Sequence, residues 1–316
     1  MTKARTPSVP SELAESWTTT GPDGVELRVY GWRGNTGDRP AVLWGHANGF
    51  AAGAYAPMLT ELAQRNDVYA SDLRGHGGSG VPEPGSGGGY DVAMSADNFG
   101  LDLTAVTASV RRRAPTRPLH FAGHSASGLG ALRMGAVFGH APFRSVTLFE
   151  PPLAPTPDHY LHAGAAQLGE TLAQRALKRR RDLSAPADFA ASLAGRPAFD
   201  RWRPDMLRAF ADATLMSAGD GWTLRCPPEA EAAVYRMTMD VSTFAALRHF
   251  DLPVLFVESD PTMQGVAPSW ATTAQGAAAE RAPKGRLARI DRTSHMMPFE
   301  RPDAVREIVD EMVANS

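Results

Sequence analysis

A serine stands in a turn that could present it as a nucleophile. Residues 119–128 read Leu-His-Phe-Ala-Gly-His-Ser-Ala-Ser-Gly, so an apolar run enters a Gly-x-Ser turn and a small-residue helical pattern leaves it. A turn of this kind, a nucleophile elbow, exposes the Ser125 hydroxyl above a helix N-terminus, where backbone N–H groups can stabilise an oxyanion. The fifth position of the usual Gly-x-Ser-x-Gly pattern is Ser127, which is small enough for close packing between strand and helix.

A serine hydroxyl is a poor nucleophile until a base takes its proton. His295 is the best candidate for this base, because it lies late in the chain, directly before a C-terminal helical pattern. The other histidines have weaker surroundings, including His124 beside the serine. A serine, an acid and a histidine in that chain order indicate acyl transfer through a covalent intermediate.

Two further segments accompany the elbow. Residues 41–50 are an apolar strand pattern running into a His/Gly loop, and residues 71–80 read Ser-Asp-Leu-Arg-Gly-His-Gly-Gly-Ser-Gly. With them the chain resembles the α/β-hydrolase superfamily. The His-x-x-Gly-Phe loop, the Asp-Leu-Arg-Gly-His-Gly-x-Ser segment, the elbow and the late His-x-x-Pro-x-Glu-x-Pro stretch stand in the order of that family. The resemblance spans about residues 25–155 and 250–315 and implies an α/β-hydrolase fold, a mostly parallel central sheet flanked by helices.

Composition sets limits on partners and location. The 316-residue chain has a net charge of −2, so no long-range field favours nucleic acid or an anionic membrane surface. No run approaches 18 apolar residues, and the first twenty lack the apolar core of a secretion signal, so we expect a cytoplasmic protein. No His-x-x-x-His pattern or carboxylate cluster suggests a metal, and we expect no cofactor. The sequence carries no signal of oligomeric state.

The order of predicted elements divides the chain. Residues 25–32 alternate and predict an antiparallel edge strand, whereas residues 41–44 predict a strand buried on both faces. Strands then alternate with helices as far as residue 149, as in a parallel sheet. Residues 151–250 predict helices only. We therefore expect an N-terminal extension at 1–20, a core at 21–150 and 251–316, and an inserted helical cap at 151–250.

The acid that would orient the histidine has two candidates. Family acids usually follow the strand after the cap in a Gly-x-x-Asp turn, but here the glycine is absent and an ungapped count places Thr262 at the acid position. Asp260 would serve only if the loop were shortened. Glu150 ends the strand predicted before the cap, where some α/β hydrolases resemble this chain in placing a glutamate. A carboxylate at the end of a strongly apolar strand needs a partner, which favours Glu150.

We expect two backbone N–H groups in the oxyanion hole, and the second of them has two candidates. The resemblance implies the N–H of Ala126, directly after the nucleophile, together with an amide from the 46–50 loop. An alignment on His46 selects Asn48, and an alignment on Gly49 selects Phe50. We favour Asn48 and keep Phe50 as the alternative.

The expected activity is hydrolysis of a carboxylic ester, thioester or lactone through an acyl-enzyme. Three alternatives use the same triad: carbon–carbon bond hydrolysis, cofactorless perhydrolysis, and transfer of the acyl group to an alcohol or amine instead of water. A fourth is a non-catalytic ligand-binding receptor of the same fold. The substrate should be a small molecule with an apolar portion, and aromatic and methionine side chains of the cap could also form the cap's own core. The predicted pocket residues are His124, Met296, Met297 and Trp222.

Overall fold

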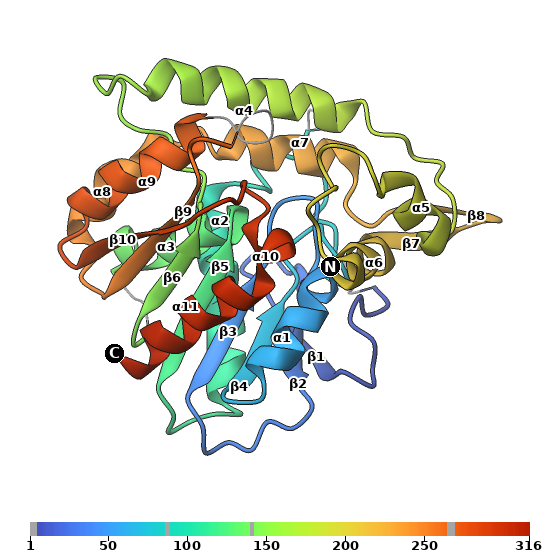
Figure 1. Ribbon diagram of the computed structural model, residues 1–316, viewed down its shortest axis with the longest axis horizontal. Coiled ribbons are helices and arrows are strands. Elements are labelled where there is room, and N and C mark those ends of the chain that lie inside the picture. Colours follow the sequence, from blue (N-terminus) through green and yellow to red (C-terminus); the bar gives the residue numbers. More distant parts are fainter. Residues whose placement is uncertain (1–4, 86–88, 140–141, 264–268) are drawn as a thin grey trace.

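The computed structural model describes residues 5–85, 89–139, 142–263 and 269–316. Within these ranges an eight-stranded sheet has the order β1-β2-β4-β3-β5-β6-β9-β10, as Figure 1 shows. Strand β2 is antiparallel to both neighbours, and the pairs from β4 to β10 are parallel. The strands are β1 (Ala14–Thr20), β2 (Glu26–Trp32), β3 (Ala41–Gly45), β4 (Asp67–Ser71), β5 (Leu119–His124), β6 (Val146–Phe149), β9 (Val254–Ser259) and β10 (Gly285–Ile290).

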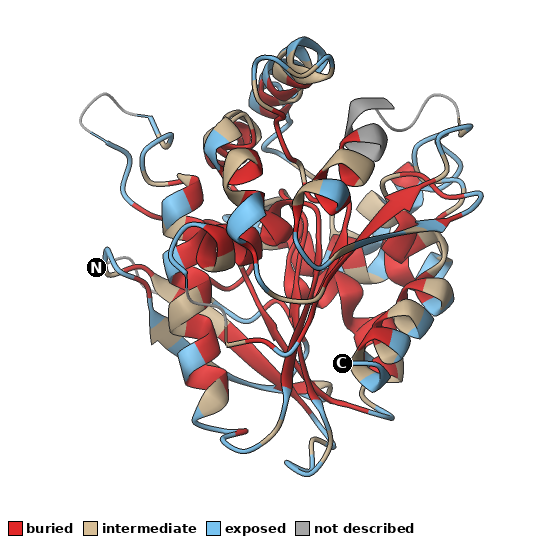
Figure 2. Ribbon diagram, turned by 90° about the vertical axis from the view of Figure 1, so that its left-hand side faces the viewer, coloured by how far each residue is buried: buried red, intermediate tan, exposed pale blue. Residues whose placement is uncertain are grey.

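Apolar side chains on both faces bury the central strands. In β3, Ala41 and Leu43 belong to one hydrophobic cluster, while Val42 and Trp44 belong to the cluster on the opposite face. This is the two-residue period of a strand covered on both sides. Figure 2 shows the buried strands between two layers of helices. Helices α2 (Ala96–Arg111), α3 (Ala126–Ala136) and α9 (Ser269–Arg281) lie on one face, and α1 (Ala56–Leu62) and α11 (Pro302–Ala314) lie on the other. The predicted fold class is therefore confirmed.

The prediction of an edge strand at residues 25–32 is wrong. Strand β2 occupies this stretch, but β1 pairs along its outer side and forms the edge of the sheet. Most of β1 is exposed or half-buried and it has few apolar residues, so its sequence gives little strand signal. Trp17 nevertheless packs edge-on against Tyr69 and donates its indole N–H to Ser109 Oγ at 3.2 Å. Part of the predicted N-terminal extension thus belongs to the central sheet.

The stretch between β6 and β9 contains a β-hairpin, although its sequence predicts helices only. Strands β7 (Leu215–Ala218) and β8 (Gly221–Leu224) pair antiparallel across a two-residue turn, in which Gly219 has a φ of +56°. Each strand has only four residues, which is too short to stand out in a stretch, residues 151–250, whose sequence predicts helices only. Helices surround the hairpin in sequence: α4 (His162–Leu177), α5 (Pro186–Leu193), α6 (Pro204–Thr214), α7 (Pro228–Met237) and α8 (Val241–Ala246). No helix among the described residues is long and apolar enough to cross a bilayer.

Helix α4 lies with α7 across the end of the sheet in Figure 1. A Cβ atom at Gly169 of α4 would lie 2.5 Å from Met239 Sδ and 3.2 Å from the Tyr235 carbonyl. The absence of a side chain at this position therefore lets α4 approach the end of α7 closely. The carboxyl ends of β3, β5, β6, β9 and β10 open toward this cover, which is where open α/β sheets bind ligands.

The close packing of the elbow predicts the effect of adding one methyl group. A Cβ atom at Gly45 would lie 2.5 Å from Ser127 Cβ, so Gly45→Ala should lower the free energy of unfolding by about 1–3 kcal/mol. Because Ser127 makes the clash, Ser127→Gly in the same chain should recover most of the loss. Urea denaturation of the single and double variants measures both effects. Equal losses with and without Ser127 would contradict this account.

Candidate active site

Ser125 occupies a strained turn between β5 and α3. Its N–H continues the pairing of β5 with β6 by donating to the Phe149 carbonyl at 2.9 Å. The chain then turns at φ 55° and ψ −123°, a conformation that is rare for a residue other than glycine. Strain of this kind is typical of functional sites and is held by the surrounding structure. Here Ser127 Oγ donates to the His124 carbonyl at 3.1 Å and fills the space above Gly45 and Gly123.

Buried Glu150 forms a hydrogen-bonded pair with the partly exposed His295. Glu150 ends β6, its N–H donates to the Val257 carbonyl at 3.0 Å, and its φ of 47° turns the fully buried side chain beneath the His295 ring. His295 Nδ1 lies 2.7 Å from Glu150 Oε2. Ser259 donates to Glu150 Oε1 from its backbone N–H at 2.7 Å and from its hydroxyl at 2.5 Å. An ionised carboxylate can only accept, so Nδ1 carries the proton and the lone pair is on Nε2.

The surroundings of Glu150 keep it ionised. Burial raises the pKa of its carboxyl, but the hydrogen bond and charge of His295, together with the Ser259 bonds, outweigh burial and hold the pKa below its ordinary value. A carboxylate that is charged at neutral pH can fix the imidazole orientation and stabilise an imidazolium.

Asp260, the other predicted acid, has different partners. Its Oδ2 accepts the Arg292 N–H at 2.9 Å, and its Oδ1 accepts from the N–H and hydroxyl of Thr262 at 2.9 and 2.6 Å. Its own N–H donates to the Thr293 carbonyl at 3.0 Å. Arg292 has a φ of 58°, so Asp260 stabilises the tight turn that leads to His295. Of the two candidate carboxylates, the structure brings Glu150 to the His295 ring.

The amides of the 46–50 loop have distinct partners. The Ala47 N–H donates to Tyr55 Oη at 3.1 Å, the Gly49 N–H to His76 Nε2 at 3.0 Å and the Phe50 N–H to the Ala47 carbonyl at 3.1 Å. In the part of the chain that the structure describes, the Asn48 N–H has no such acceptor. Among the amides of residues 47–50, that of Asn48 is therefore the one available to a ligand, and Phe50 contributes its side chain to the cavity wall.

Tyr55 and His124 link the site loops, and no sequence motif points to Tyr55. His124 Nε2 lies 2.8 Å from the His295 carbonyl, which can only accept, so Nε2 carries the proton. His124 Nδ1 then accepts the Tyr55 hydroxyl at 2.8 Å, and the same hydroxyl accepts the Ala47 N–H. Burial, followed by the charge of His295, lowers the pKa of His124 and keeps it neutral. These hydrogen bonds join the 46–50 loop, the elbow at Ser125 and the loop that carries His295.

Asp72, His46 and His76 hold the segments around the 46–50 loop in place by hydrogen bonds, and burial keeps both histidines neutral. Asp72 accepts hydrogen bonds from Ser8, Tyr30 and the N–H groups of Ala52 and Gly78. His46 Nδ1 lies 2.8 Å from the Ala47 carbonyl, and its Nε2 accepts the Leu73 N–H at 2.8 Å. His76 is fixed in the same way, with Nδ1 2.8 Å from the Arg74 carbonyl and Nε2 toward Gly49. The family-like loops at 46–50 and 71–80 are thus one hydrogen-bonded unit.

Ser125 and His295 line a common cavity of about 280 Å³. The cavity walls are mostly apolar, which is typical of sites for small organic molecules. Phe50, Phe199, Trp202 and Phe210 form an aromatic wall, with ring centroids of Phe50 and Phe210 4.7 Å apart. The other lining residues are Ala47, Asn48, Ala126, Glu150, Pro152, Leu168, Gly169, Leu172, Arg179, Ala198, Tyr235, Thr238 and Met296.

Three of the four predicted pocket residues are wrong. Met296 lines the cavity, but Met297 begins α10 (Met297–Glu300) and is fully buried in the core, since successive helical residues point in different directions. His124 lies buried behind the elbow and is used by Tyr55 and His295. Trp222 belongs to the β7–β8 hairpin, at the far end of the cap in Figure 1, and its carbonyl accepts the Leu183 N–H. Within the described ranges no group of three His, Cys, Asp or Glu residues could hold a metal.

Removal of the Tyr55 hydroxyl should disturb the site without changing its shape. Tyr55→Phe leaves the Ala47 N–H and His124 Nδ1 without their partner, so we expect a loss of about 2 kcal/mol in the free energy of unfolding and a lower kcat. Urea denaturation and ester turnover measure these effects. Tyr160→Phe, at a side chain that is 83% exposed, is the control. If both variants behave alike, the network has no role.

Buried neutral histidines predict a stability that declines in acid. Burial, followed by the charge of His46, lowers the pKa of His76 to about 3, whereas an unfolded histidine titrates near 6.5. Between these values the unfolded chain binds a proton that the folded chain does not, so stability falls as the pH falls below about 6.5. At pH 5.5 the loss from His76 is about 1.4 kcal/mol. His76→Gln should remove this contribution when unfolding is compared at pH 7.5 and 5.5. An unchanged pH dependence would exclude it.

Comparison with known proteins gives the family. No curated protein matches the chain. Among solved structures, E-2-(acetamidomethylene)succinate hydrolase has a TM-score of 0.70 at 19% identity and covers 95% of this chain and 99% of its own. The thioesterase domain from the curacin biosynthetic pathway has a TM-score of 0.67 at 19% identity (94% and 98% covered), and the enol-lactonase from Burkholderia xenovorans LB400 has 0.61 at 18% (92% and 96%). These likenesses agree in fold. The model of the alpha/beta hydrolase family matches residues 41–308, and the chain belongs to this family.

Proposed function

We propose that this chain is a serine hydrolase that cleaves a carboxylic ester, thioester or lactone, with Ser125 as nucleophile, His295 as base and Glu150 as the acid. The observation that carries the proposal is the 2.7 Å hydrogen bond from His295 Nδ1 to buried Glu150, which leaves Nε2 as the proton acceptor. His295 shares its cavity with Ser125 on the strained elbow. The inserted residues 151–250 act as a cap over this cavity.

The first half of the reaction forms the acyl-enzyme. His295 Nε2 takes the proton of the Ser125 hydroxyl while Oγ attacks the carbonyl carbon of the substrate. The oxyanion that forms accepts hydrogen bonds from the N–H groups of Ala126 and Asn48. When the tetrahedral intermediate collapses, the bond to the leaving oxygen or sulfur breaks, and that atom takes the proton from His295.

The second half returns the enzyme to its starting state. Water gives a proton to His295 Nε2 and attacks the acyl carbonyl, and collapse breaks the bond to Ser125 Oγ, which recovers its proton. The acyl product leaves as an acid. The mostly apolar cavity favours a small-molecule substrate with an apolar portion.

The names of structurally similar proteins support acyl chemistry. The thioesterase domain and the enol-lactonase share the fold of this chain and are named for hydrolysis at an acyl carbon. We therefore prefer an ester, thioester or lactone to carbon–carbon cleavage. The absence of a membrane-spanning helix among the described residues agrees with a cytoplasmic location, which we also propose.

Covalent labelling with a fluorophosphonate tests the nucleophile and the acid together. Peptide mass mapping should find the adduct on Ser125, and Ser125→Ala should lose labelling and at least about a thousandfold in kcat while remaining folded. Glu150→Gln keeps the shape of the side chain but removes the charge that fixes His295. We expect it to slow labelling and turnover by about a thousandfold or more.

Asp260→Asn is the matched control for Glu150→Gln. The amide oxygen of asparagine can still accept the Arg292 N–H, so labelling should stay within about threefold of wild type. A larger loss in Asp260→Asn than in Glu150→Gln would assign the acid to Asp260. No adduct on Ser125 in the folded wild-type protein would reject the serine hydrolase.

A further inference from the structure

Among the described residues that line the largely apolar cavity, Arg179 is the one with a cationic side chain. Arg179 follows the end of α4 in sequence and contributes to the cavity wall, and its side chain is 44% exposed. Of the other ionisable side chains described in the wall, Glu150 and His295 are bonded to each other, and burial raises the pKa of the Tyr235 hydroxyl, which keeps its proton. Arg179 is thus the cationic group of the wall that the proposed reaction does not use.

A buried carboxylate holds this guanidinium in place. Arg179 Nη2 lies 2.7 Å from Oε1 of Glu231, a side chain on α7 that is only 2% exposed. A guanidinium has five N–H donors in a rigid plane, and one carboxylate oxygen does not use them all. Arg179 also hydrogen-bonds with the side chain of Tyr235, another residue of the cavity wall, and these two partners together still do not use all five donors. The pair therefore orients the group while its remaining donors can bind a ligand.

The same glutamate is attached to the oxyanion loop. Asn48 Nδ2 donates to the Glu231 carbonyl at 3.0 Å. Gly49 has a φ of 76°, and a Cβ atom there would lie 2.9 Å from Glu231 Oε1. The guanidinium is consequently fixed relative to Asn48, the amide proposed to hold the oxyanion. A group bound by Arg179 would be held at a defined distance from the reacting carbonyl.

We propose that Arg179 is a specificity residue that binds a carboxylate of the substrate, remote from the bond that is cleaved. This inference rests on the proposed function and narrows the substrate class to esters, thioesters or lactones that also carry a carboxylate. Arginine suits this role because its planar fork matches a carboxylate with two parallel hydrogen bonds.

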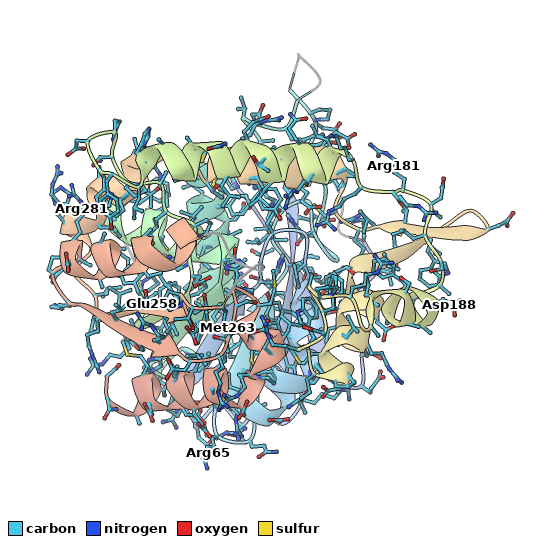
Figure 3. All side chains as sticks on the ribbon, turned by 45° about the horizontal axis from the view of Figure 1, so that its top comes forward. Arg65, Arg181, Asp188, Glu258, Met263 and Arg281 are labelled. Carbon is cyan, nitrogen blue, oxygen red and sulfur yellow. The ribbon has the colours of Figure 1, made fainter. Side chains whose placement is uncertain are left out.

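The chain provides a matched control two residues away. Arg181 pairs with Glu229, so it joins the same two segments as Arg179 and Glu231, but it does not line the cavity. Figure 3 shows Arg181 beyond the end of α4. Arg181→Gln also removes a guanidinium and its ion pair with Glu229 of α7, but it leaves the cavity wall unchanged.

The experiment compares esters that differ only in charge. One set consists of the monoethyl esters of succinic, glutaric and adipic acids, each paired with the primary amide of the same half-ester. A second set, 4-acetoxybutanoate and 4-acetoxybutanamide, places the charge on the alcohol side. The ratio of kcat/KM for the acid to that for the amide is measured in wild type, Arg179→Gln, Arg179→Lys and Arg181→Gln.

We expect wild type to favour the acid in at least one pair, and Arg179→Gln to lower that ratio about ten- to hundredfold. Arg179→Lys keeps the charge without the fork and should give an intermediate ratio, and it replaces the glutamine variant if that variant fails to fold. Arg181→Gln should keep the wild-type ratio. Equal ratios in Arg179→Gln and wild type, or no preference for any acid in wild type, would overturn the inference.

The two proposals fail in different ways. If fluorophosphonate labels Ser125 and the amides are hydrolysed without a preference for the acids, the role of Arg179 is wrong and the serine hydrolase stands. If Ser125 is not labelled and no ester is cleaved, the proposed function itself is wrong.

Discussion

A carboxylate buried at the end of β6 constrains the rest of the site. Glu150 has no exposed surface, and an unpaired charge there would be strongly destabilising; removing one partner from such a pair typically costs about 3–5 kcal/mol. Ser259 from the end of β9 and His295 from the loop after β10 supply its hydrogen bonds. Because the buried Glu150 carboxylate needs these hydrogen bonds, the ends of the neighbouring strands β6, β9 and β10 must come together. The hydrogen bond to His295 also fixes the orientation of its ring.

Strain is concentrated where these strands end. Among the described residues, the three non-glycine residues with positive φ are Ser125, Glu150 and Arg292, which lie after β5, β6 and β10. Each conformation is unfavourable alone, and each is held by neighbours: ladder bonds continue to Ser125 and Glu150, and Asp260 accepts the Arg292 N–H. Ser127 packs against Gly45 and Gly123, and it stands at the position that glycine occupies in the usual elbow pattern.

The inserted residues 151–250 contact the core through polar groups as well as apolar packing. The aromatic wall joins Phe50 of the core to Trp202 and Phe210 of the inserted segment. The Glu231 carbonyl and side chain contact the 46–50 loop from α7, while Arg179 reaches Glu231 from beyond the end of α4. A change at the cap would therefore act both on the shape of the cavity and on the loop that carries Asn48.

The sequence alone determined the fold class, the elbow at Ser125 and the late His295, because these depend on local patterns: buried strands read as apolar runs, and a nucleophile elbow requires small residues at fixed spacing. It also favoured Glu150, since a charge at the end of an apolar strand needs a partner. Only the tertiary structure decided which carboxylate reaches His295 and that the Asn48 N–H, unlike those of Ala47, Gly49 and Phe50, has no acceptor among the described residues. It also brought Tyr55 to His124 and Arg179 to the cavity wall. It also placed Met297 and Trp222 away from the cavity and revealed β1 and the β7–β8 hairpin. These depend on contacts between residues far apart in the chain, for which neither spacing nor composition carries a signal.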